Sequence, residues 1–417
     1  MSIILKSAKV INAESKYNGT KQDILISEGK IVKIAKSIEI DSAQVIKIEN
    51  LHVSVGWLDS SVSFGEPGYE ERETIEHGAL VASKSGFTDI ILNPNTDPVL
   101  DKQTDISFVK LKSKNATCSI HPLGALSISS KSVDMAELFD MKNAGAVGFY
   151  DFKKPIKNSN LLKTSLLYSQ SFDSLIMSFP FDESIAKNGI INEGVISLNY
   201  GIKGIPNFSE EVQINRDLQI LEYTGGRLHI PTISTKKSVE LIKNAKSKGL
   251  MVTCSVAIHN LIFNETKLKD FDTRFKVLPP LRSEEDRLAL IEAVDKGIID
   301  LVTSDHTPID IENKKTDIDN SKFGTIGLES FFGSLLTIFS LEKTIEILTK
   351  GKDIFMIEET TLNEGSLAKL SLFTVSNEYE FSKENILSKS KNSAFLGLKM
   401  RGKPLGIINS KKICINE

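Results

Sequence analysis

The polar residues best suited to chemistry follow short apolar runs of the sequence. Ser61 and Ser63 come shortly after Trp57-Leu58-Asp59, and residues two apart on a strand face the same side. A serine acts as a nucleophile only beside a base, and histidines near the ends of the predicted strands are scarce. Nucleophilic catalysis by Ser61 or Ser63 therefore stays an alternative, but the sequence offers no clear base for it.

Asp305 and His306 follow a second apolar run, Leu301-Val302-Thr303. Asp305 is either a proton shuttle or a strand-end carboxylate satisfied by neighbouring backbone and hydroxyl groups. Without a metal we favour the second interpretation. Asn95 either contacts a ligand or caps a turn, since Asn-Pro and Asn-Thr segments form turns by themselves.

Strand-like runs that alternate with helical segments must position these residues. The alternation is typical of parallel β/α units. Eight such units predict a (β/α)8 TIM barrel in an α/β fold, with the active site at the C-terminal ends of the strands. The predicted strands are Ser54–Leu58, Thr88–Leu92, Cys118–Leu123, Ala146–Tyr150, Ser174–Phe179, Arg227–Thr232, Met251–Val256 and Asp300–Ser304.

Both ends of the chain are rich in short β-type runs. We therefore expect residues 1–50 and 365–417 to pair into one discontinuous β-sandwich domain, and residues 51–364 to form the barrel. The segment Ile309–Phe323 is polar and rich in lysine, which predicts a mobile loop after the eighth strand.

Composition excludes several classes of protein. The chain has 417 residues, is 40% hydrophobic and carries a formal net charge of −3, so a large core is expected but no nucleic-acid or membrane partner. The three cysteines lie far apart without C-x-x-C spacing, which argues against a disulfide framework and a cysteine-ligated zinc site. With no secretory signal and no apolar run near about 20 residues, we expect a cytoplasmic protein.

A series of short motifs resembles the dihydroorotase branch of the amidohydrolase superfamily over nearly the whole chain. That resemblance implies zinc-dependent hydrolysis of a ring amide, in which the metal polarises the carbonyl and supplies hydroxide. The motifs, in order, are Gly56-Trp57-Leu58-Asp59, Glu66-Pro67-Gly68-Tyr69-Glu70, Glu73-Thr74-Ile75-Glu76, Asn93-Pro94-Asn95-Thr96, Ala144-Gly145-Ala146-Val147, Pro279-Pro280-Leu281-Arg282, Ser304-Asp305-His306 and Gly327-Leu328-Glu329.

The resemblance also shows where this sequence departs from the family. The positions of the four zinc histidines are occupied by Ser61, Ser63, Phe179 and Thr232. A serine hydroxyl is a poor zinc ligand at neutral pH, so we expect no metal cofactor. Two acidic positions are kept, Asp151 after strand four and Asp305 as final ligand and proton shuttle, whereas Phe152 replaces the second aspartate of the usual pair.

The substrate-binding positions change as well. In the family an arginine, two asparagines and a histidine hold the substrate, and here Gly65 stands at the arginine position, Leu278 at one asparagine and Ile309 at the histidine. Asn95 and His306 remain as candidate substrate-binding residues.

Histidines elsewhere leave one further alternative open. His121, His259 and His306 lie near predicted strand ends, so together they form a candidate relocated metal site. His229 is three residues before Thr232, and this odd spacing places it on the opposite face of the strand, as expected of a packing histidine.

We therefore expect a catalytically inactive dihydroorotase homologue with a structural or regulatory role, and aspartate transcarbamoylase is the candidate partner. The resemblance also implies a homodimer. The alternative is an active cyclic-amide hydrolase that uses an altered or single-metal site with Asp151 and Asp305. A third hypothesis is a small-molecule binding module that reuses the barrel mouth.

Overall fold

Eight parallel strands form a closed barrel in the computed structural model, which describes residues 2–416. They fall into a group of three and a group of five, and bridges from Gly124 to Phe149 and from Val62 to His306 join the two groups into a ring. The (β/α)8 prediction is thus confirmed. The strands are β6 (Trp57–Val62), β7 (Phe87–Leu92), β8 (Ser119–Pro122), β9 (Phe149–Tyr150), β10 (Leu175–Met177), β13 (Arg227–Ile230), β14 (Val252–Ala257) and β15 (Leu301–Thr303).

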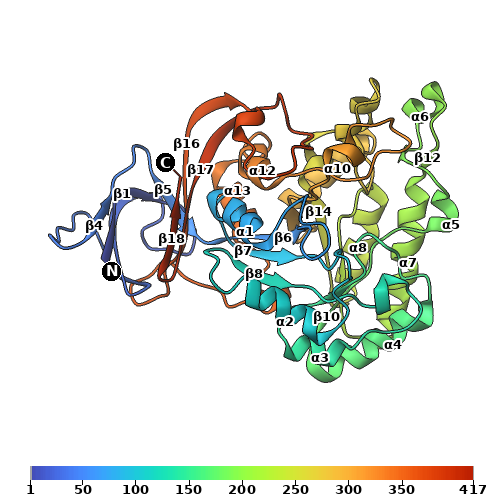
Figure 1. Ribbon diagram of the computed structural model, residues 1–417, viewed down its shortest axis with the longest axis horizontal. Coiled ribbons are helices and arrows are strands. Elements are labelled where there is room, and N and C mark those ends of the chain that lie inside the picture. The colour runs from blue at the N-terminus through green and yellow to red at the C-terminus, as the bar shows by residue number, and fades with distance from the viewer. Residues whose placement is uncertain (1, 417) are drawn as a thin grey trace.

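Helices follow the strands and surround the barrel (Figure 1). Several begin at a hydroxyl side chain that accepts a backbone N–H of the first turn, as Thr235 does from Ser238 and Ser283 from Asp286, which stabilises the helix start. The helices are α1 (Ile75–Lys84), α2 (Gln103–Lys112), α3 (Leu138–Asn143), α4 (Ser159–Ser169), α7 (Asn207–Thr224), α8 (Lys236–Ser247), α10 (Glu284–Asp295), α12 (Leu328–Leu335) and α13 (Leu341–Thr349).

The prediction for the first barrel strand is wrong in its boundaries. Residues 54 and 55 belong to β5 (His52–Val55), which lies in a different sheet, and the barrel strand β6 begins only at Trp57. Gly56 separates the two strands, and a Cβ there would lie 2.1 Å from the Thr88 hydroxyl. The close approach of β7 therefore requires glycine at this crossing. As a result Ser61 lies within β6 and Ser63 directly after it.

The two ends of the chain meet in one eight-stranded sheet, seen at the left of Figure 1. Apolar residues of both ends, such as Leu5, Ile24 and Leu370, share one buried cluster. The division of the chain at residues 50 and 364 stays a prediction. The strands are β1 (Ser2–Val10), β2 (Lys21–Ser27), β3 (Lys30–Ala35), β4 (Gln44–Ile46), β5, β16 (Lys369–Glu380), β17 (Lys399–Asn409) and β18 (Lys412–Ile415).

Short helices and strands lie within the loops of the barrel. An excursion after β10 contains α5 (Glu183–Ala186), β11 (Ile191–Asn192), α6 (Val195–Tyr200) and β12 (Gly204–Ile205), and α9 (Ile258–Ile262) follows β14. The predicted mobile loop contains α11 (Ile311–Lys314). Lys314 and Lys276 are buried and donate to backbone carbonyls along this loop. These hydrogen bonds fix the position of the loop.

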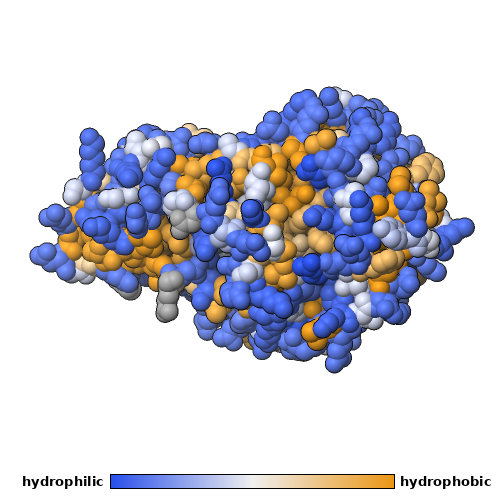
Figure 2. Space-filling model, turned by 90° about the horizontal axis from the view of Figure 1, so that it is seen from above, coloured by the Kyte–Doolittle hydropathy of each residue, from blue (hydrophilic) through white to orange (hydrophobic). Residues whose placement is uncertain are grey.

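The surface gives no sign of a membrane-spanning segment. Among the described residues, no helix combines the length and the apolar character needed to cross a bilayer. Hydrophilic side chains are spread over most of the face in Figure 2, with apolar areas between them.

Candidate active site

Polar side chains from the first, second and eighth strands meet at the C-terminal mouth of the barrel. Asn93, directly after β7, donates its side-chain N–H to Ser61 Oγ at 3.1 Å and to Ser63 Oγ at 3.2 Å. Ser61 Oγ in turn donates to Asp305 Oδ1 at 3.4 Å. The two serines are thus buried members of a hydrogen-bond network that ends on the retained aspartate.

Lys153 is the direct partner of Asp305. Its Nζ lies 2.6 Å from Asp305 Oδ2, with side-chain exposures of 10% and 1%. Burial raises the pKa of Asp305, and the Lys153 charge acts against that increase. Sequence reasoning missed Lys153, although a lysine directly after Asp151-Phe152 at the end of a barrel strand was a usable signal.

Asp151 does not converge on the same point. Its Oδ1 accepts the backbone N–H groups of Leu126 and Ser127, each at 3.0 Å, and its Oδ2 accepts the Ser127 hydroxyl. Burial raises its pKa against the effect of these donors. This carboxylate therefore anchors the loop after β8.

Phe179 and Thr232, which the sequence resemblance predicts at two histidine positions, follow β10 and β13. The Phe179 side chain is 1% exposed and belongs to the apolar cluster of the barrel interior, which also contains Met177 and Tyr150. Thr232 is buried, its hydroxyl has no hydrogen-bond partner among the described residues, and its φ of 50° lies in the left-handed region. Neither side chain offers a ligand of the kind that zinc sites use.

The residues at the barrel mouth do not fit the family's zinc. Serine, threonine and phenylalanine replace imidazole, Asp151 is engaged elsewhere, and an ammonium group already neutralises Asp305. Within residues 2–416, no three His, Cys, Asp or Glu side chains gather closely enough to hold a metal ion.

The three histidines of the alternative metal site do not meet. His121 Nε2 lies 2.9 Å from Asp89 Oδ1, beside Lys352 and Lys369 near the N-terminal end of the barrel, so the expectation that it reaches the mouth is wrong. His259 is fully buried, and burial, with the charge of Lys153 next in effect, holds its pKa well below the usual value.

His306 and His229 are held inside the protein. His306 Nδ1 accepts the backbone N–H groups of Gly327 at 3.2 Å and Leu328 at 3.4 Å, which assigns the ring proton to Nε2, and burial lowers its pKa. His229 is within hydrogen-bond distance of the Thr253 and Ser255 hydroxyls, at 2.8 and 3.1 Å. It is therefore placed as a packing residue.

Two of the residues predicted at the family's substrate-binding positions lie in tightly packed or buried surroundings. A Cβ on Gly65 would lie 1.7 Å from the Tyr69 carbonyl oxygen, so the loop after β6 has no room for an arginine there. Ile309 is buried. Asn95 is partly exposed, and its Oδ1 has no partner within the described part of the chain. Its role in ligand binding stays a prediction.

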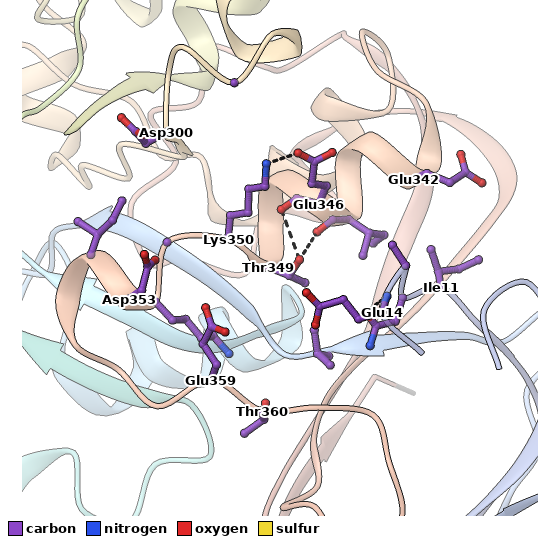
Figure 3. A pocket seen from close by; sticks show the side chains of 18 of the residues that line it. Ile11, Glu14, Asp300, Glu342, Glu346, Thr349, Lys350, Asp353, Glu359 and Thr360 are labelled. Carbon is purple, nitrogen blue, oxygen red and sulfur yellow. Dashed lines mark hydrogen bonds and ion pairs between the residues drawn. The ribbon is translucent and has the colours of Figure 1, made fainter. Parts of the chain in front are cut away.

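A surface cavity of about 520 Å³ lies at the other end of the barrel, between residues 11–18 and the starts of β14 and β15. Figure 3 shows acidic side chains around it, including Glu14, Glu342 and Glu359, with Lys350 paired to Glu346. Catalytic residues of this fold lie at the C-terminal ends of the strands, so we do not assign the active site to this cavity.

Solved structures share this fold. An L-hydantoinase (dihydropyrimidinase) from Arthrobacter aurescens superposes with a TM-score of 0.85 at 23% identity, covering 99% of this chain and 96% of that one. A dihydropyrimidinase from Brevibacillus agri NCHU1002 gives 0.84 at 20% identity, covering 100% and 95%. The fold is therefore that of the amidohydrolases, with a TIM barrel and a β-rich domain built from both termini.

Sequence comparison identifies the family of this chain. The family model described as "Dihydro-orotase-like" matches residues 52–238. A dihydroorotase of Acetivibrio thermocellus is 34% identical over 100% of this chain and 99% of its own length. One of Caldicellulosiruptor saccharolyticus is 36% identical over 95% and 94%. The chain belongs to the dihydroorotase family.

Proposed function

We propose that this protein is a dihydroorotase homologue that has lost zinc-dependent hydrolysis and serves a structural or regulatory role. One observation carries the proposal: the four histidine positions hold Ser61, Ser63, Phe179 and Thr232, which together cannot ligate zinc. The packing of these residues supports it, because the serines lie in a buried hydrogen-bond network and Phe179 lies in the apolar interior.

The proposed role requires a partner. Aspartate transcarbamoylase is our first candidate, on the resemblance to non-catalytic members of the family, and we further propose that the chain forms a homodimer. Light scattering on the purified protein tests the dimer. Mixing it with aspartate transcarbamoylase of the same organism tests the partnership: co-elution with a change in transcarbamoylase activity is expected, and separate elution at micromolar concentrations contradicts it.

Loss of activity is tested by a dihydroorotate hydrolysis assay in both directions. The protein is purified once with a chelator and once after incubation with zinc. We expect no turnover above the uncatalysed rate in either preparation. A family member that has its four zinc histidines, assayed in parallel, is the matched control. Zinc-dependent turnover by this chain overturns the proposal.

A second candidate function is hydrolysis of a cyclic amide through an altered site. Near full-length identity of 34–36% to proteins named dihydroorotase favours it. Asp305 is then the proton shuttle, because it lies at the family's position and keeps its carboxylate next to Lys153. Asp305→Asn would abolish turnover in that case, and unchanged turnover in this variant would exclude Asp305 from the chemistry.

A further inference from the structure

Asp305 needs a positive partner to be stable where it lies. Its side chain is 1% exposed, and an isolated ionised carboxylate in a protein interior is strongly unfavourable. Apart from Lys153, the described residues give its carboxylate one hydrogen bond, the 3.4 Å contact from the Ser61 hydroxyl. In a zinc-binding relative the metal would supply the compensating charge, but the ligand positions of this chain do not support a metal.

The structure points to one source of that charge. Among the described residues, only Lys153 lies within ion-pair distance of Asp305. Other cations at this end are engaged: Arg72 with Asp310, and Lys314 with backbone carbonyls. His259 is buried, and its ring nitrogens have no hydrogen-bond partner in the part of the chain that the structure describes.

The backbone conformation at Lys153 directs its ammonium group toward Asp305. Its φ of 54° lies in the left-handed region, which is unfavourable for a residue with a side chain. Its N–H donates to the Tyr150 hydroxyl at 3.1 Å, and its Nζ lies 5.2 Å from the centre of the Phe152 ring. These contacts hold the strained turn and direct the side chain across the mouth to β15.

We propose that Lys153 takes the electrostatic place of the metal, as a covalently attached cation that lets the barrel mouth assemble around Asp305 without a bound ion. This inference rests on the proposed function, since it assumes that zinc does not bind here. It assigns to Lys153 a positioning role.

A double-mutant cycle tests the pair. Lys153→Met, Asp305→Asn and the double variant are unfolded with denaturant at one pH in the presence of a chelator, with the exposed neighbour Lys154→Met as the matched control. Removing one partner of a buried ion pair is strongly destabilising, so the unfolding constant of Lys153→Met should rise about 100-fold or more. The double variant should recover most of this loss, and Lys154→Met should match the wild type.

Additive effects of the two substitutions, or a Lys153→Met variant as stable as Lys154→Met, would overturn the inference. If Lys153→Met does not fold, recovery of folded protein in the double variant supports the pairing, and failure to recover it counts against the pairing. Zinc titration of the wild type is a separate readout: stoichiometric binding would refute the proposed function, whereas the cycle alone decides the role of Lys153.

Discussion

Phe179→Ala is the substitution with the largest calculable consequence at the barrel mouth. Phe179 stands at a zinc-histidine position but is 1% exposed among apolar residues of the barrel interior. Truncating a buried phenylalanine removes its transfer free energy and leaves a cavity, and such changes cost about 3–5 kcal/mol. We therefore expect the free energy of unfolding to fall by about that amount.

Equilibrium unfolding in urea, followed by circular dichroism, measures this change. The matched control is Phe208→Ala, because Phe208 is 59% exposed on α7 and surface substitutions usually stay within about 0.5 kcal/mol. A loss below about 1 kcal/mol for Phe179→Ala, similar to the control, would refute the reasoning. It would mean that the ring faces an open mouth in solution.

Three further substitutions test other parts of the structure. Arg282→Met should cost about 3–5 kcal/mol in denaturant unfolding, because it leaves Glu210 buried without its cation; a neutral result would contradict this. Burial lowers the pKa of His229 to about 3. The neutral imidazole therefore contributes stability above the unfolded pKa near 6.5, and this contribution is lost as pH falls toward 3. In His229→Gln the free energy of unfolding should depend less on pH between these two values. Lys369→Met should lower the melting temperature, since it removes a cation from buried Asp89; an unchanged melting temperature would contradict this.

The barrel was predictable because its strands are apolar runs separated by helical segments. Seven of the eight predicted runs contain the whole of the corresponding barrel strand or all but one of its residues, although most runs were predicted longer than the strand. The first strand was misplaced because the apolar pattern continues through Gly56, where the chain passes from the terminal sheet into the barrel. Only the close approach of Thr88 marks that crossing, and contacts between distant residues are not visible in a sequence.

The loss of the family's ligands stays a prediction from motif spacing, which singled out Ser61 and Phe179. The pairing of Lys153 with Asp305 was not predicted, because it joins residues far apart in sequence. His121 was expected at the mouth because it stands near the end of β8, yet its ring bonds to Asp89 of the neighbouring strand. Side-chain direction within a barrel depends on register, which periodicity alone does not fix.

The most direct test of the central claim is the zinc content of the folded protein. The chain is incubated with excess zinc, passed through a desalting column and analysed for metal, with Asp305→Asn and a zinc-binding family member as references. Because the mouth offers hydroxyls, an apolar ring and a neutralised aspartate, we predict far fewer zinc ions than chains. One or more zinc ions per chain, lost in Asp305→Asn, would contradict it.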